Sequence, residues 1–200
     1  TGVNNFDKED IKHSKKLGYR IKLISEARLI DDKIFISTSL KLININNPLA
    51  HVEGVLNAIK IETDHLKSLF IEGEGAGGPA TASSVISDLY EIAKGGNHKS
   101  IGYLSSTLRE IDPYERENLK RPYYLRILVK DQPGVLSKIT SILTSKNISI
   151  QTILQLTEEK IDNKVPIVLT TYDTLEKNLN EAISNISKEN FLEDEIVTIT

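Results

Sequence analysis

The order of hydrophobic patterns in residues 122–200 constrains the fold more than any other feature of this sequence. Several stretches alternate apolar and polar residues, as half-buried strands do, and others repeat apolar residues every three or four positions, as helices do. The predicted strands are 123–129, 148–156, 165–172 and 196–200, and the predicted helices are 135–143 and 175–186. This βαββαβ order is that of the split βαβ unit, whose two helices pack on one face of a four-stranded antiparallel sheet.

The first third of the chain predicts a separate layer of sheet. Asp7 is a suitable N-cap for a short helix, and Gly18 is suitably placed just beyond its end. Two strands are expected to form a hairpin around Asp31-Asp32, and two more follow a break at 46–48. These four predicted strands cover 19–29, 33–45, 55–62 and 66–71. The fold class is therefore α/β and α+β.

A glycine-rich stretch, 71–85, ends this sheet layer. Four of the chain's eleven glycines fall within 73–78, between a predicted strand and an amphipathic helix predicted over 80–93. Glycines at such a place allow a positive φ and let a ligand approach the main chain, and the free N–H groups of the helix favour an anion. A tight structural turn is an equally good interpretation of the glycines alone.

Composition excludes several classes of function. The net charge of −3 gives no broad basic face, so we expect no nucleic-acid partner. The chain has no cysteine, and its four histidines show no metal-ligand spacing. No apolar run approaches the ~20 residues that span a bilayer, and no signal peptide is visible, so we expect no membrane partner and a cytoplasmic protein. The chain begins at Thr1 and lacks methionine, so we expect the start of the gene product to be absent.

Three segments in order resemble homoserine dehydrogenases. They are Gly18-Tyr19-Arg20-Ile21-Lys22-Leu23, then Asn47-Pro48-Leu49-Ala50-His51-Val52-Glu53-Gly54-Val55-Leu56-Asn57-Ala58, then the glycine stretch through Thr81-Ala82-Ser83. The family patterns are LGY-x-IKL, HPLA-x-V-x-G-x-x-NA and G-x-GAG-x-x-PTAS. The tail, 125–156 with Asp131-Gln132-Pro133-Gly134-Val135-Leu136, resembles an ACT domain, which has the ferredoxin-like βαββαβ fold. The resemblance covers essentially the whole chain and corresponds to the C-terminal part of the family.

The sequence departs from the family pattern at a few positions. Asn47 stands where the family has His, and the Pro-Thr-Ala of the family becomes Pro79-Ala80-Thr81-Ala82. The family's dinucleotide-binding domain and the region of its catalytic lysine are expected to lie upstream of these residues. We therefore predict no catalytic residue here, and Lys22 is interpreted as a solvated or paired lysine of a strand.

The resemblance implies an organisation and an activity. Residues 95–121 are polar and irregular, and this shift in composition predicts a linker. The resemblance implies that 1–94 is the C-terminal part of the catalytic (substrate and dimerisation) domain and that 122–200 is an ACT regulatory domain. The whole enzyme would interconvert L-homoserine and L-aspartate 4-semialdehyde with NADP or NAD, in the biosynthesis of threonine, methionine and isoleucine. A homo-oligomer is expected.

The resemblance also implies two binding sites and no metal site. The cofactor would lie against the backbone of the glycine stretch, at Gly75, Ala76, Gly77 and Thr81. An amino-acid effector, expected to be threonine, would bind at Asp131, Gln132, Gly134, Val135, Asn147 and Ile148. An alternative interpretation is that Asp131-Gln132-Pro133-Gly134, the loop after the first ACT strand, only forms a favourable turn and binds no ligand.

A second hypothesis belongs to another class: a stand-alone ACT regulatory protein that binds an amino acid without catalysis. An upstream reading frame with G-x-G-x-x-G would favour the dehydrogenase, and a start codon just before Thr1 would favour the regulator. The sequence leaves open NAD against NADP, the oligomeric state, and a kinase domain fused upstream.

Overall fold

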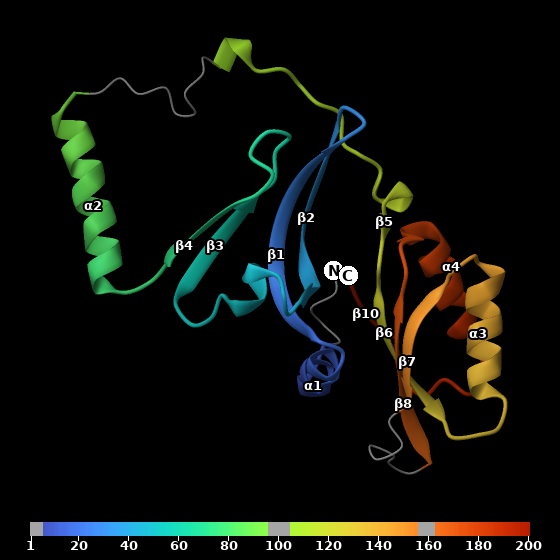
Figure 1. Ribbon diagram of the computed structural model, residues 1–200. Helices are drawn as coiled ribbons and strands as arrows, with labels where there is room; N and C mark the ends of the chain where they lie inside the picture. Colours follow the sequence, from blue (N-terminus) through green and yellow to red (C-terminus); the bar gives the residue numbers. More distant parts are fainter. Residues whose placement is uncertain (1–5, 96–104, 156–162) are drawn as a thin grey trace. The chain divides into compact units, whose positions relative to one another are not determined.

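The computed structural model describes residues 6–95, 105–155 and 163–200, and Figure 1 shows its elements. The chain divides into two compact units, which are considered separately here. The first unit combines Thr1–Asn44 with Asp112–Thr200, and the second is Ile45–Ile111. Parts of the predicted linker lie outside the described residues.

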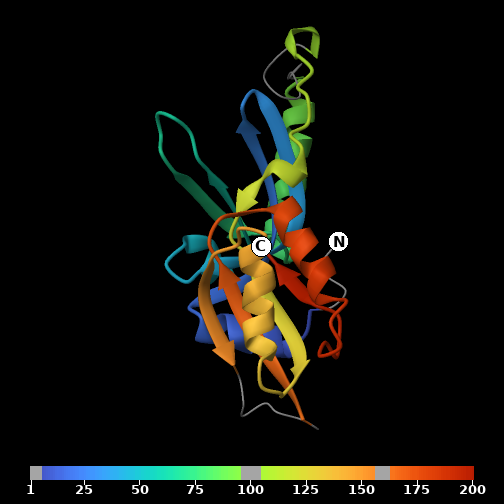
Figure 2. The ribbon, with the colours of Figure 1, turned by 90° about the vertical axis from the view of Figure 1, so that its right-hand side faces the viewer.

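A four-stranded antiparallel sheet forms the centre of the first unit. Its strand order is β10-β6-β8-β7, and every neighbouring pair is antiparallel. Helices α3 and α4 cover one face, and Figure 2 shows both in front of the sheet. The elements are β6 (Tyr124–Lys130), α3 (Val135–Ser145), β7 (Ile150–Gln155), β8 (Lys164–Thr171), α4 (Glu176–Ile186) and β10 (Val197–Ile199). The predicted βαββαβ order and its ferredoxin-like fold are confirmed.

The core lies between this sheet and its two helices. Leu125, Ile127 and Val129 alternate along β6, so that all three point to the helix face, and each is at most 1% exposed. Ile139 of α3 and Leu179 of α4 are equally buried and belong to the same cluster. Each such side chain contributes about 1.5–3 kcal/mol on leaving water, so this layer holds the C-terminal part together.

The opposite face of the sheet is covered by the start of the chain. This cover consists of α1 (Lys8–Lys16) and the hairpin of β1 (Tyr19–Ile30) and β2 (Lys33–Asn44). Tyr124 and Val168 of the sheet pack against Leu17 and Leu40 in a second buried cluster. The N–H of Leu42 also donates to the carbonyl oxygen of Thr200 at 2.7 Å. The hairpin and the predicted ACT region therefore form one compact unit.

The compact units divide the chain differently from the predicted boundaries at 94/95 and 121/122. Residues from Asp112 onward belong to the first unit, where Ile34 donates to the carbonyl of Asp112 and accepts from the N–H of Tyr114. Three short elements described here were not expected from the sequence: β5 (Lys120–Arg121) pairs with β9 (Thr174–Leu175), and η3 (Arg116–Asn118) precedes β5. The domain assignment taken from the family resemblance stays a prediction.

The second unit is thin and leaves its apolar side chains exposed. It contains η1 (Pro48–His51), the antiparallel pair β3 (Leu56–Ile61) and β4 (Leu69–Glu74), and α2 (Gly78–Ala93). No residue of α2 is buried, and Leu89 of its predicted apolar stripe is 60% exposed. Ile59 and Ile71 of the strand pair are exposed as well. These apolar faces have the composition of a core without the second layer that a core requires.

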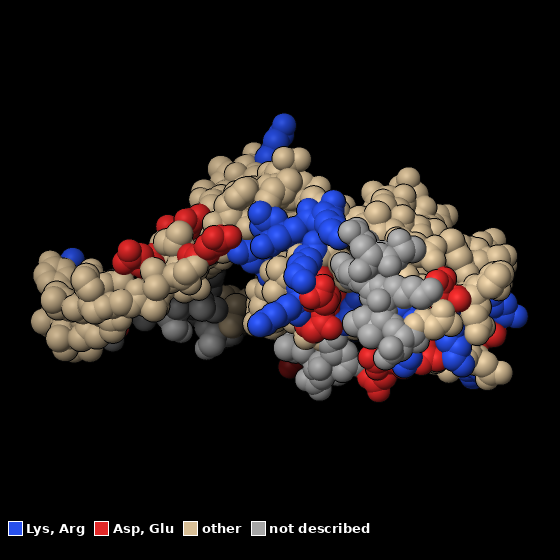
Figure 3. Space-filling model, turned by 90° about the horizontal axis from the view of Figure 1, so that it is seen from below, with Lys and Arg blue, Asp and Glu red and all other residues tan. Residues whose placement is uncertain are grey.

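Basic residues gather on part of the surface. In Figure 3, Lys and Arg atoms group near the middle of the face seen from below, with some Asp and Glu atoms next to them. Helix α1 carries Lys8, Lys12, Lys15 and Lys16, the last two in its final turn, where they complement the helix dipole. Among the described residues, no helix is both long and apolar enough to cross a membrane.

Candidate functional site

The glycine stretch joins β4 to α2, as the sequence predicted. The N–H of Gly75 donates to the carbonyl oxygen of Val55 at 2.8 Å, which fixes the end of β4 beside the start of β3. Gly77 is the N-cap of α2 and has a φ of +117°, a conformation that favours glycine. Pro79 lies in the first turn, where its missing N–H is harmless. No side chain caps the helix, so its first N–H groups are available to a ligand.

The side chain of Asn57 occupies the space next to Gly75. A Cβ at Gly75 would lie 1.5 Å from Nδ2 of Asn57, whereas a Cβ at Gly73 would meet open space. Two of the segments that resemble the dehydrogenase family, one ending in Asn57-Ala58 and the glycine stretch, are therefore in direct contact. Sequence analysis did not find this contact, because 18 positions separate the two residues.

By spacing alone, Gly73, Gly75 and Gly78 match the pattern G-x-G-x-x-G. The dinucleotide motif, however, belongs to a parallel βαβ unit, and β4 here pairs antiparallel with β3. The stretch is therefore not a dinucleotide fold of its own. Ala76 and Thr81, also predicted to contact a cofactor, are exposed in the same loop and in the first turn of α2.

The predicted effector site is split between the two ends of α3. Gly134 is the N-cap of α3 with a φ of +89°, and Asp131 and Gln132 lie in the turn before it. Asn147 and Ile148 follow the other end of the helix, where Asn147 has a φ of +55°. A helix of 11 residues is ~16 Å long, so one chain does not bring these two groups together.

Two of the predicted effector residues have a structural role. Val135 and Ile148 are 8% and 4% exposed and belong to the main hydrophobic core. Asp131, Gln132, Gly134 and Asn147 are more accessible. The N–H of Asp131 donates to the carbonyl of Asn163 at 2.9 Å, which ties the loop to the start of β8.

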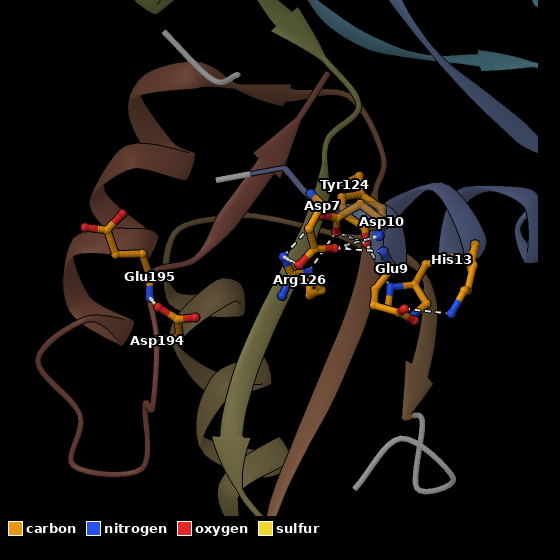
Figure 4. Close-up of polar contacts among 9 residues, drawn as sticks. Asp7, Glu9, Asp10, His13, Tyr124, Arg126, Asp194 and Glu195 are labelled. Atoms are coloured by element: carbon orange, nitrogen blue, oxygen red, sulfur yellow. Dashed lines mark hydrogen bonds and ion pairs between the residues drawn. The ribbon is translucent and has the colours of Figure 1, made fainter. Parts of the chain in front are cut away.

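A polar cluster centred on the buried Asp10, which we call the α1 cluster, joins α1 to the outer face of the sheet (Figure 4). It consists of Asp7, Asp10, His13, Tyr124 and Arg126. Arg126 donates from Nε to Oδ1 of Asp10 at 2.7 Å and from Nη2 to Oδ2 at 3.1 Å, a bidentate pair. The Tyr124 hydroxyl donates to Asp10 at 2.8 Å, and Nδ1 of His13 lies 3.3 Å from that hydroxyl.

The electrostatics of the α1 cluster follow from its burial. Burial alone would raise the pKa of Asp10, but the hydrogen bonds from Arg126, Tyr124 and the N–H of Asp7 lower that pKa below its usual value. Burial and the neighbouring carboxylate of Asp10 raise the pKa of Tyr124. Asp10 is thus an ionised carboxylate with a charged partner, and the cluster's chemistry is that of a structural clamp. In the described part of the chain, no group of three or more His, Asp or Glu is placed to hold a metal.

Comparison with known proteins divides the chain by sequence family, and not by compact unit. Residues 1–90 match the sequence profile of homoserine dehydrogenases, and 123–190 match that of ACT domains. A homoserine dehydrogenase of Helicobacter pylori is 34% identical over 92% of this chain and 43% of its own length. That of Neisseria gonorrhoeae is 32% identical over 99% of this chain and 47% of its own length.

Solved structures agree with these matches. The crystal structure of a homoserine dehydrogenase from Thiobacillus denitrificans aligns with a TM-score of 0.84 and 31% identity, covering 99% of this chain and 46% of that chain. A homoserine dehydrogenase of S. aureus, at 22% identity, aligns with a TM-score of 0.57, covers 100% of this chain and 45% of its own, and supports the fold. The chain thus spans about half the length of the curated relatives it matches.

Proposed function

The chain belongs to the homoserine dehydrogenase family and carries an ACT domain, and from this membership we propose the activity of the whole protein. That protein interconverts L-homoserine and L-aspartate 4-semialdehyde with NAD or NADP, in the biosynthesis of threonine, methionine and isoleucine in the cytoplasm. The observation that carries this proposal is the alignment of 99% of the chain with a solved homoserine dehydrogenase at a TM-score of 0.84. Residues 1–200 contribute a substrate and dimerisation layer and the regulatory domain.

The exposed apolar faces of the second unit support this assignment. Helix α2 and the pair β3–β4 present Ile59, Ile71, Ile86 and Leu89 to solvent. Each such side chain forgoes about 1.5–3 kcal/mol until another layer covers it. In the whole protein, the remainder of the catalytic domain and a second subunit supply that layer, so the enzyme is a homo-oligomer.

The glycine stretch is suited to contact a nicotinamide dinucleotide. Gly75, Ala76 and Gly77 carry nothing larger than a methyl group, and the uncapped start of α2 offers free N–H groups. The Thr81 hydroxyl lies one turn further along the same helix start. When bound, the cofactor accepts or supplies the hydride, and these residues position its nicotinamide half.

The effector site is proposed to form between two copies of the ACT domain. The loop with Asp131, Gln132 and Gly134 lies at one end of α3, and Asn147 lies at the other. Strand β7 is an edge of the sheet, so two domains can pair side by side through it. Such a pair would place the loop of one copy against Asn147 of the other, with room for an amino acid such as threonine.

The activity is tested by assaying the complete protein for homoserine-dependent reduction of NAD and of NADP, with and without threonine. We expect turnover with at least one cofactor and suppression by threonine. Turnover that is indifferent to threonine would refute the effector assignment while retaining the enzyme. The absence of turnover with both cofactors would refute the proposed activity.

The cofactor contact is tested by Gly75→Val, which we expect to abolish turnover. Because a side chain at position 75 also meets Asn57, the double variant Gly75→Val, Asn57→Ala removes that internal clash. Gly73→Val, where a Cβ meets open space, is the matched control and should retain turnover. If the double variant regains full turnover, the loss came from Asn57 and the proposed cofactor contact is wrong.

A further inference from the structure

The first unit contains a cavity that no part of the proposed function uses. Its volume is about 630 Å³, within the range of about 300–1,000 Å³ of small-molecule sites. It lies among β2, η3, α4 and β10. Its lining includes none of the predicted effector residues, and β10 and β7 are opposite edges of the sheet, so the cavity is distinct from the predicted effector loop and from the β7 edge.

One part of the cavity wall is apolar and the rest is polar. Leu40 of β2, Leu179 and Ile183 of α4, and Ile196 before β10 supply aliphatic surface. Arg116, Glu176, Asn180 and Thr198 are among the polar lining residues. A wall of this kind suits a small molecule that has both an aliphatic body and a polar head.

Charged side chains form a hydrogen-bonded network at the head of the cavity. Both carboxylate oxygens of Glu176 are engaged, one by Nε of Arg116 at 2.6 Å and the other by Nη2 of Arg121 at 2.7 Å. Two guanidinium groups therefore share one carboxylate. Glu117 also lines the cavity, and its side chain is exposed like that of Arg116, so water screens both charges.

Two buried polar atoms near the cavity have no hydrogen-bond partner among the described residues. They are Oγ of Ser39, which lines the cavity, and Nη1 of Arg121. The Arg121 side chain is only 8% exposed, and it is held directly behind the lining residues Glu176 and Tyr123. An unsatisfied buried donor costs about 1–3 kcal/mol, and a ligand is one of its ordinary explanations.

We propose that this cavity binds a small organic carboxylate with an aliphatic body. The carboxylate lies at the Arg116 end, where the unpartnered polar atoms of Ser39 and Arg121 can meet it, and the aliphatic body lies on Leu40, Leu179 and Ile183. Since Ser39 and Leu40 belong to the β1–β2 hairpin and the other walls to η3 and the ACT region, the bound carboxylate also holds the hairpin against α4 and β10.

The proposal is tested by isothermal titration of the complete protein with isovalerate. We expect saturable binding, and at least tenfold weaker binding of 3-methylbutan-1-ol, which has the same aliphatic body without the charge. Equal binding of the alcohol, or no binding of isovalerate at millimolar concentration, would overturn the proposal.

Variants locate the site. Arg116→Gln removes the exposed guanidinium, and Asn180→Trp fills the rim from an exposed position of α4, so neither disturbs the core. Both should weaken isovalerate binding at least tenfold. Lys138→Gln, an exposed cation of α3 outside the cavity, is the matched control and should bind as the unmodified protein does. If both cavity variants bind normally, or if Asp131→Asn in the effector loop abolishes binding, the proposal is wrong.

Discussion

Replacing Arg126 by glutamine tests whether the α1 cluster holds α1 on the sheet. Asp10 is completely buried, so the variant leaves a carboxylate in the interior without its charged partner. Breaking a buried ion pair on one side costs about 3–5 kcal/mol. Tyr124 and the N–H of Asp7 still donate to Asp10, which places the cost at the lower end, about 3 kcal/mol. The second ion pair of Arg126, with the exposed Asp7, adds less than about 1 kcal/mol.

Amide hydrogen exchange of α1 measures this cost directly. At 1.36 kcal/mol per factor of ten, about 3 kcal/mol corresponds to exchange about 100-fold faster in the amides of residues 12–16. Lys12→Gln is the matched control, since it removes an exposed ion pair with Glu9 on the same helix. Such a pair is worth about 0.2–0.5 kcal/mol, so exchange should change about twofold. An increase below threefold for Arg126→Gln would refute the reasoning.

Three further predictions follow from the same unit. Because folding lowers the pKa of Asp10, its ionised carboxylate stabilises the folded protein fully above its unfolded pKa of about 3.9 and loses that effect as the pH falls through its folded pKa. Amide exchange of α1 should therefore accelerate as the pH falls through this range, and Asp10→Asn should not show that acceleration. Ile139→Ala, at a fully buried site in α3, should lower the free energy of unfolding by about 2–5 kcal/mol in urea titrations, and a loss below 1 kcal/mol would contradict the assigned core. Gly134→Ala should cost about 1–2 kcal/mol in the same titration, because its φ of +89° strains any residue with a Cβ; an unchanged midpoint would rule this out.

The C-terminal sheet and its helices could be predicted because their signals are local. The alternation of apolar residues along β6 and their repeat every three to four residues along α3 are both visible in short stretches of sequence. The apolar residues of both patterns lie in the packed core. The N-cap of α1 is equally local: Asp7 and Asp10 form the expected capping box. The sequence did not predict that the length of α3 separates the two groups of effector residues, because a sequence motif does not give the distance between residues at opposite ends of a helix.

The packing of α1 could not be predicted because its buried face is polar. Asp10, His13 and Ser14 are fully buried, whereas Ile11 of the same helix is exposed. An amphipathic pattern would assign these faces the other way round. The arrangement depends on Arg126, 116 residues away, which pairs with Asp10 and makes its burial possible. The nine residues of α1 contain no signal that identifies Arg126 as the partner of Asp10.

One signal in the sequence does indicate that both faces of the sheet are covered. Strand β8 has apolar residues at the consecutive positions Ile167, Val168 and Leu169, and all three are at most 1% exposed. A strand with one face in water alternates, whereas a strand covered on both faces does not. Ile167 and Leu169 face α3 and α4, and Val168 faces the cluster that includes Leu40 of the hairpin. The composition shift at 95–121 indicates where one region of the chain ends and the next begins. The apolar run of β8 indicates instead that something packs on both faces of the sheet. The two signals give different domain boundaries because the β1–β2 hairpin, which precedes the linker in sequence, packs on the sheet that follows it. A ligand that orders the sheet or its helices therefore acts on a surface that the β1–β2 hairpin already contacts.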